Sequence, residues 1–165
     1  MKGPDVITRR EMLGTLGALG VAAAAGGLMA GAPRRAQAQQ LGLHETAEEA
    51  LKRVFGGRPM KDGSGVITLD IPAIAENGAL VQTSVVVESP MTPASHVTHV
   101  WIVADKNRIP VVFRATLAPE AGRAYVGVTI RLGETGDVRA IAEQSDGTLL
   151  QVKREVKVTV GGCGG

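Results

Sequence analysis

The chain has 165 residues, of which 44% are hydrophobic and 21% are charged, and its formal net charge at pH 7 is +2. This near-balance argues against nucleic acid and anionic membranes as partners, because both require concentrated positive charge. Aromatic residues make up only 2% of the chain, too few for a platform that stacks bases. The one cysteine, Cys163, excludes a disulfide within the chain, so its thiol is free, bridged to another molecule or a covalent attachment point.

Residues 1–38 have the features of an export signal. The paired Arg9 and Arg10 precede an uncharged, Gly- and Ala-rich run over residues 12–33, and Ala36-Gln37-Ala38 follows as an A-x-A-like processing site. Paired arginines ahead of such a run are typical of the bacterial twin-arginine signal. The run is long enough for a retained membrane anchor, but its composition makes it only weakly hydrophobic. We therefore expect cleavage after Ala38, export of the folded protein to the periplasm, and no membrane attachment afterwards.

Cleavage would leave residues 39–165, which is enough for one domain with a hydrophobic core. The signal carries five of the 18 basic residues and two of the 16 acidic residues, so the mature chain has a net charge of −1. We expect one folded domain over residues 39–160, followed by a flexible segment over residues 161–165.

A short helix is predicted over residues 44–55. Thr46 and Glu49 have the spacing of a capping box at its start, and Gly56-Gly57 ends it. Apolar residues recur at the spacing of an amphipathic helix, namely Leu43, Ala47, Ala50, Leu51 and Val54. We expect this face to cover the domain or a partner.

Beyond Val66 the hydrophobic period changes to two, which predicts strands. The predicted strands are residues 66–71, 79–87, 96–103, 111–117, 124–132, 138–143 and 149–160. In strand 124–132 the even-numbered residues are predicted to face inward. In the last strand Val160 is also predicted to face inward, whereas Arg154 breaks the alternation of that strand and is expected near an edge of the sheet. Turn clusters separate most strands and no helices lie between them. The pattern indicates an all-β fold, an antiparallel immunoglobulin-like β-sandwich with a short N-terminal helix.

Cys163 stands in the tail Gly161-Gly162-Cys163-Gly164-Gly165, where no neighbour has a side chain. Glycine adopts backbone conformations that are closed to other residues, so residues 161–165 are predicted to form a thin, flexible arm. Three extended residues after Val160 would carry the sulfur about 10 Å from the sheet. Such an arm can enter a pocket of another protein, and the sequence therefore indicates a carrier that holds a substrate on Cys163.

Other site chemistries have weaker support. His96 and His99 lie three apart in a predicted strand, where side chains alternate between faces, and His44 is distant, so no metal site is expected. No residue pattern for general acid–base catalysis or phosphate binding is visible, and we expect no catalytic residue and no cofactor. The turn Asp105-Lys106-Asn107-Arg108 is interpreted as a hairpin tip. Two alternatives to the carrier stay open: a thiol redox enzyme or sensor, which requires a lowered thiol pKa, and an interaction domain that dimerises through Cys163.

The tail and several internal motifs resemble the SoxY family of sulfur-carrier subunits. The similar segments are residues 156–165, Ser89-Pro90-Met91, residues 96–100, residues 105–110 and Ser145-Asp146-Gly147-Thr148. The resemblance implies an immunoglobulin-like sandwich that pairs with a second β subunit, SoxZ, and carries sulfur intermediates on Cys163. It also implies three enzymes that act on the arm: a c-type cytochrome enzyme that joins thiosulfate to the thiol, a hydrolase that releases sulfate, and a sulfane dehydrogenase. The carrier itself is implied to be no enzyme.

Overall fold

The structure is a computed structural model that describes residues 44–161. The chain divides into two units, Met1–Ala38 and Gln39–Gly165, and all described residues belong to the second. The predicted export signal, with Arg9 and Arg10, lies outside the described residues and stays a prediction. Within residues 44–161, no helix is long and apolar enough to cross a membrane.

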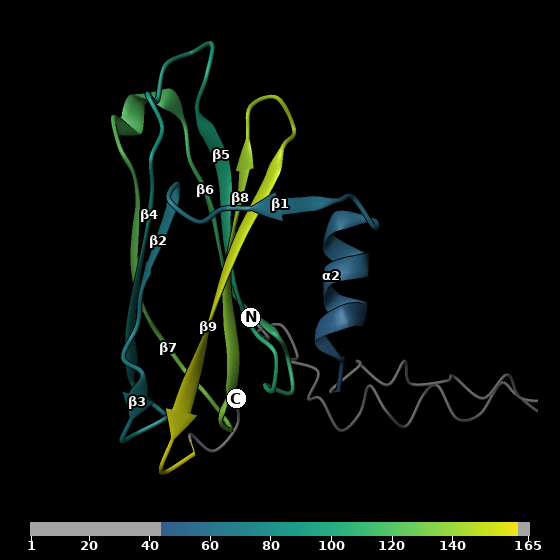
Figure 1. Cartoon of the computed structure of the whole chain (residues 1–165), viewed down its shortest axis with the longest axis vertical. Coiled ribbons are helices and arrows are strands. Elements are labelled where there is room, and N and C mark those ends of the chain that lie inside the picture. The colour runs from purple at the N-terminus through teal and green to yellow at the C-terminus, as the bar shows by residue number, and fades with distance from the viewer. Residues whose placement is uncertain (1–43, 162–165) are drawn as a thin grey trace, which may run out of the picture. The chain divides into compact units, whose positions relative to one another are not determined.

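One α-helix, one short 3-10 helix and nine strands are described (Figure 1). They are α2 (Ala47–Phe55), β1 (Met60–Asp62), β2 (Ile67–Asp70), β3 (Ile74–Ala75), β4 (Val81–Val87), β5 (Val97–Ala104), β6 (Val111–Thr116), η1 (Pro119–Ala121), β7 (Ala124–Ile130), β8 (Gly136–Gln144) and β9 (Leu149–Val158). All seven predicted strands and the predicted helix are present, with shifted ends.

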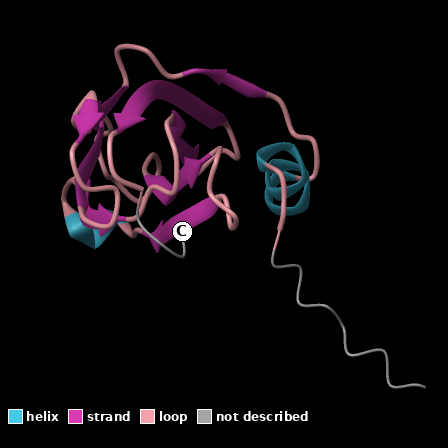
Figure 2. Ribbon diagram, turned by 90° about the horizontal axis from the view of Figure 1, so that it is seen from below, coloured by secondary structure: helices cyan, strands magenta, loops and turns pink. Residues whose placement is uncertain are grey.

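The strands form two sheets that pack face to face (Figures 1 and 2). The larger sheet has the order β1-β9-β8-β5-β6, with β3 also paired to β9, and the smaller sheet has the order β2-β4-β7. In the smaller sheet the β4–β7 register runs from Val81 opposite Ile130 to Val87 opposite Ala124. These sheets confirm the predicted all-β, immunoglobulin-like sandwich with a short N-terminal helix.

Two strands, β1 and β3, are absent from the sequence prediction. They have three and two residues, which is too short for an alternating pattern to be visible. Both pair in parallel with β9, so the prediction of a wholly antiparallel sandwich is wrong at these two pairs. A parallel partner is reached through a crossover and not through a hairpin turn, so no local turn signal announces it.

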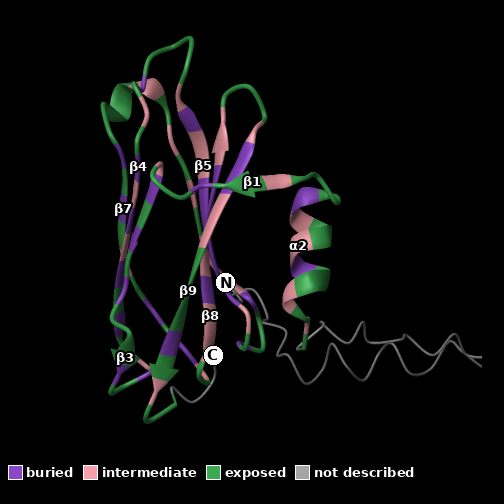
Figure 3. Ribbon diagram, in the orientation of Figure 1, coloured by how far each residue is buried: buried purple, intermediate pink, exposed green. Residues whose placement is uncertain are grey.

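The main core lies between the sheets, and a second cluster lies on the outer face of the larger sheet. In this second cluster the ring of Phe55 from α2 meets the ring of Trp101 edge to face, with the centroids 4.9 Å apart. Val103, Ile141 and Leu149 complete it. The helix thus covers the domain itself, which is why the middle of β8 and most of β5 are buried on both faces (Figure 3).

The helix begins three residues later than predicted. Thr46 is the residue that caps it: its hydroxyl accepts the Glu49 N–H at 3.2 Å, and the Glu49 carboxylate accepts the Thr46 N–H at 2.9 Å. The capping box is therefore confirmed, but the extended backbone of Thr46 leaves His44 outside the helix. Gly56 ends α2 at a φ of 63°, a conformation that glycine adopts without steric penalty.

The inward and outward faces follow the sequence pattern closely in β7 and less well in β9. The even-numbered residues 124–132 are buried or half-buried, and their neighbours are exposed, as predicted. Val160 is a correction: β9 ends at Val158, and Val160 is exposed. Arg154 lies between the stretches of β9 that pair with β1 and β3, where that edge is open, and it donates to the Ile71 carbonyl oxygen at 3.4 Å.

Candidate functional site

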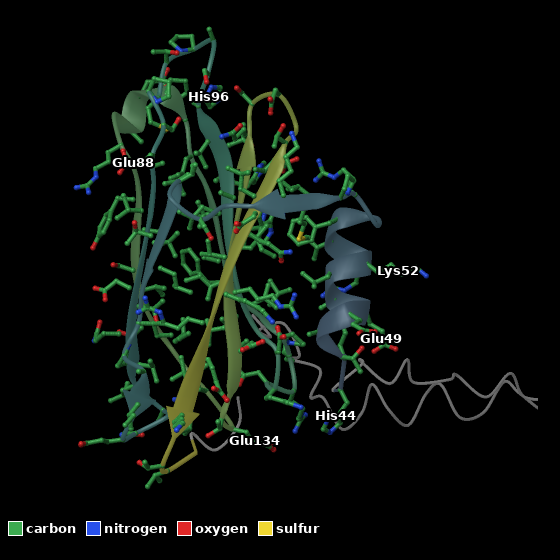
Figure 4. All side chains as sticks on the ribbon, in the orientation of Figure 1. His44, Glu49, Lys52, Glu88, His96 and Glu134 are labelled. Atoms are coloured by element: carbon green, nitrogen blue, oxygen red, sulfur yellow. The ribbon has the colours of Figure 1, made fainter. Side chains whose placement is uncertain are left out.

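The predicted attachment site, Cys163, lies outside the described residues together with Gly162, Gly164 and Gly165. The structure does describe the segment from which the predicted arm leaves, residues 157–161, which we call the arm root. Its last residue, Gly161, is exposed. The arm root lies at the end of the sandwich where β9 stops. In Figure 4, Glu134 marks this end, and His96 and Glu88 mark the opposite end.

Backbone hydrogen bonds hold the arm root beyond the end of β9. On the β3 side, the Lys157 N–H donates to the Ala73 carbonyl oxygen at 2.9 Å, and the Thr159 N–H donates to the Ala75 carbonyl oxygen at 3.1 Å. One residue further, the carbonyl oxygen of Val160 accepts the Gly78 N–H at 2.8 Å. The chain is therefore fixed through Val160, as expected for an arm tied to a rigid sheet.

The loop between β7 and β8 holds the arm root from the other side. The Thr135 hydroxyl oxygen accepts the Val158 N–H at 2.9 Å. Gly161 packs so closely on Gly133 that a Cβ at position 161 would overlap the carbonyl oxygen of Gly133. Glycine is thus required at position 161 by a close backbone approach, a reason that the sequence alone does not reveal.

Asn107 fixes the position of that loop. Its side-chain amide donates to the Arg131 carbonyl oxygen at 2.7 Å, and its side-chain oxygen accepts the Gly133 N–H at 2.9 Å. Residues 105–108 connect the antiparallel neighbours β5 and β6, so they form the predicted hairpin tip, but Asn107 within it is only 6% exposed. Sequence reasoning singled out the segment by its family resemblance but missed this role, because the Asn107 partners lie more than twenty residues away.

Asp105 of the same turn also has a defined partner. The Arg139 guanidinium donates to both carboxylate oxygens of Asp105, at 2.6 and 2.8 Å, and this hydrogen bonding raises the pKa of Arg139. On the helix side, Arg58 donates to Glu143 at 2.6 Å. These pairs join elements of the scaffold. We therefore assign them a structural role.

The two histidines of β5 and the preceding turn lie apart. The Nδ1 atom of His96 is 3.1 Å from the Thr92 carbonyl oxygen, whereas the His99 ring stacks on Trp101 and its Nδ1 lies 3.4 Å from a Glu143 carboxylate oxygen. A register shift in β5 separates Val97 from His99. Among residues 44–161, no group of three or more His, Asp, Glu or Cys side chains could hold a metal ion.

Surface hollows lie away from the arm root. One, on the outer face of the smaller sheet, is lined by Asp70, Gln82, Thr83, Ser84, Tyr125, Gly127 and Val128. Another, beside α2, is lined by Leu51, Phe55, Met60, Arg58 and neighbouring polar residues. Neither of these two hollows combines a nucleophile, a base and an orienting group.

Comparison with solved structures places the fold among known proteins. The sulfur carrier protein SoxY from Chlorobium limicola is 29% identical, with 68% of this chain and 96% of that chain covered and a TM-score of 0.57. The superoxide reductase neelaredoxin from Ignicoccus hospitalis is 18% identical, with 70% and 95% covered and a TM-score of 0.50, a likeness that concerns the fold alone. Comparison with curated protein sequences gives no match.

Comparison with protein-family models gives the clearest result. The model of the sulfur oxidation protein SoxY matches residues 51–163, a range that begins in α2, includes every described strand and ends on the single cysteine. The matched range is well over half of the chain, and the structure from Chlorobium limicola agrees with it. The chain therefore belongs to the SoxY family of sulfur oxidation proteins.

Proposed function

We propose that this protein is a periplasmic sulfur carrier that holds thiosulfate-derived intermediates on Cys163 and presents them to successive Sox enzymes. The observation that carries the proposal is the family match, which extends to residue 163 and so includes the one cysteine of the chain. The relative from Chlorobium limicola is itself a sulfur carrier protein. The arm root supports the same function, because its hydrogen bonds fix Val160 and give the cysteine-bearing segment a defined starting point.

The chemistry starts with a free thiol on Cys163. The thiol and thiosulfate form a sulfur–sulfur bond, the thiol proton is released, and two electrons pass one at a time through a c-type cytochrome enzyme to its electron acceptors. A hydrolase then uses one water molecule to release the terminal sulfone as sulfate and a proton, which leaves a persulfide on Cys163. A sulfane dehydrogenase oxidises the outer sulfur with oxygen from water and removes the electrons, and a second hydrolysis restores the thiol.

In this cycle the carrier supplies attachment and presentation, with no catalytic group and no cofactor of its own. Gly161, Gly162, Gly164 and Gly165 keep the arm narrow, because none has a side chain that would block a channel. Attachment removes the need to recapture each intermediate from solution, since a tethered substrate has a high effective concentration at the next active site. A SoxZ-like β subunit is the stable partner, and Arg9 and Arg10 direct the folded protein to the periplasm.

The experiment that tests the proposal is an intact-mass measurement on the mature protein purified from thiosulfate-grown cells, with and without reductant. Reductant-sensitive additions of about 32, 80 or 112 Da are expected, for sulfane, sulfonate and thiosulfonate adducts on the cysteine. The Cys163→Ser variant is the matched control and should carry none of them. An unmodified monomer, or a disulfide-linked dimer as the only modified form, would contradict the carrier function and favour an interaction domain or a redox protein.

A further inference from the structure

The distance between the arm root and the sulfur limits where an enzyme can sit. Cys163 stands two positions after Gly161, with only Gly162 between them. An extended chain spans at most about 3.6 Å per residue, so the sulfur lies within about 10 Å of the Gly161 Cα once the side chain is added. An active site that closes around the sulfur must therefore bring its entrance onto the surface that surrounds Gly161.

The arm root cannot lengthen this reach without breaking its own contacts. Val160 is hydrogen-bonded to Gly78, Thr159 to Ala75, and Val158 to Thr135, so the chain is held from both sides up to Val160. Release of Val160 alone would leave the Gly78 N–H without its partner. The enzyme must therefore bind directly at the arm root, because the hydrogen bonds of residues 158–160 keep these residues from lengthening the arm.

The surface around the arm root carries exposed apolar side chains. Val160 is 64% exposed, and Leu80, two residues from the bonded Gly78, is 68% exposed. Ile74, which pairs with Lys157 of the arm root, is 57% exposed. Single exposed apolar residues are ordinary, but these three come from two distant stretches, residues 74–80 and the arm root, which hydrogen bonds join at one site. We call Ile74, Leu80 and Val160 the root patch.

We infer that the root patch is the docking surface for the enzymes that act on Cys163, an inference that rests on the proposed function. The occupant is an enzyme whose recessed active site has an apolar rim around its entrance. The stable β subunit does not fit this surface, because a permanent partner there would block every enzyme from the sulfur. Three side chains make a small contact, and small interfaces are typical of transient complexes, as a carrier that passes between enzymes requires.

The test compares charged substitutions inside and outside the root patch. Leu80→Asp and Val160→Asp each place a carboxylate at the contact. Tyr125→Asp is the control, because Tyr125 is also exposed, at 52%, but lies far from the root patch. Tyr125 pairs with Val86 of β4. Val86 is five residues from Val81, where β4 begins next to Leu80, so the two sites are about 17 Å apart along the strand. Each variant is prepared as the complex with its β subunit. Two rates are measured, thiosulfate loading on Cys163 by the c-type cytochrome enzyme and alkylation of Cys163 by N-ethylmaleimide.

At enzyme concentrations below saturation, Leu80→Asp and Val160→Asp are expected to slow enzymatic loading at least about tenfold, while Tyr125→Asp stays within about twofold. Alkylation should be unchanged in all three, because a small reagent does not need the docking surface. Loading of both root-patch variants at the wild-type rate would overturn the inference. The inference would also be overturned if alkylation slowed by the same factor as loading, because the thiol itself would then be less accessible.

Two further outcomes separate this inference from the proposed function. If the wild-type complex is not loaded by the enzyme at all, the proposed function fails, whatever the variants do. Gel filtration of the complex shows whether two copies of this chain associate. If they do, and if Leu80→Asp abolishes that association, the root patch is a contact between copies of this chain and the docking inference is wrong. The milder Leu80→Asn variant, which adds no charge, should slow loading by an intermediate factor.

Discussion

Asn107 and Gly133 are joined by a hydrogen bond of 2.9 Å from the Gly133 N–H to the Asn107 side-chain oxygen, and this bond links the turn after β5 to the loop before β8. The same loop supplies Thr135, which binds Val158, and the Gly133 carbonyl oxygen, against which Gly161 packs. A buried amide thus supports the surface from which the predicted arm leaves, although it lies in a different hairpin.

Replacement of Asn107 by alanine should destabilise the domain by about 1–3 kcal/mol, because it leaves the Arg131 carbonyl oxygen and the Gly133 N–H without their partner. Urea unfolding followed by the fluorescence of Trp101, the one tryptophan of the chain, measures this change. Asn107→Asp keeps an acceptor for the Gly133 N–H but turns a carboxylate oxygen toward the Arg131 carbonyl oxygen at a buried position, so at pH 7 it should be at least as unstable as Asn107→Ala. A wild-type unfolding midpoint for Asn107→Ala would show that water replaces the amide without cost.

A methyl group at position 161 should disturb the arm root more than the fold. Gly161→Ala places a Cβ against the Gly133 carbonyl oxygen, so the backbone must shift where the arm begins. Displacement of a reacting group by about 1 Å can cost about a hundredfold in rate, so we expect enzymatic loading of Cys163 to fall between about tenfold and a hundredfold. Loading is followed by intact mass. Gly164→Ala widens the arm by the same methyl group on the far side of the sulfur, so it measures the effect of arm width alone. Equal loading of both variants would contradict this role of Gly161.

The parts of the fold that depend on neighbouring residues could be predicted from the sequence. The capping box joins Thr46 and Glu49, which are only three positions apart. The alternation of β7 is visible in consecutive residues because one face of the strand packs on the core. The parts that depend on distant residues could not. β3 is a strand only because it lies beside β9, and the burial of Asn107 depends on a loop that begins more than twenty residues later. A period of two, extended past the last ladder pair of Ala75 with Val158, predicts an inward Val160, but the strand ends before that residue.

The contact between Phe55 and Trp101 should be the main attachment of α2 to the larger sheet. Phe55 is buried, and Phe55→Ala would remove most of its side chain from the second core cluster, at a cost of about 3–5 kcal/mol. Trp101 should become more exposed, which would shift its fluorescence emission to longer wavelength. Lys52→Ala, on the exposed side of the same helix, is the control. An unshifted emission in Phe55→Ala would show that α2 contributes little to the burial of Trp101.

The start of α2 should weaken in acid. Hydrogen bonds from the Thr46 N–H and hydroxyl lower the pKa of Glu49 below its ordinary value of 4.5, and a hydrogen bond from Arg53 lowers the pKa of Glu45. A lowered pKa in the folded state means that the stabilisation is complete above about pH 4.5 and is lost as the pH falls through the lower, folded value. Urea unfolding of the wild-type protein between pH 7 and pH 3, followed by Trp101 fluorescence, should therefore show falling stability at the acid end.

Other carboxylates share this behaviour, since the pKa values of Asp62 and Asp146 are also lowered by hydrogen bonds within their turns. The informative quantity is therefore the difference between the wild type and the Glu45→Gln, Glu49→Gln double variant. Glutamine at position 49 can still accept the Thr46 N–H but does not titrate, so the capping box persists at every pH. The double variant should be the less stable protein at pH 7, where it lacks the ion pair with Arg53, and the gap should close toward pH 3. A gap of constant size across this range would contradict the assignment of the acid sensitivity to these two carboxylates.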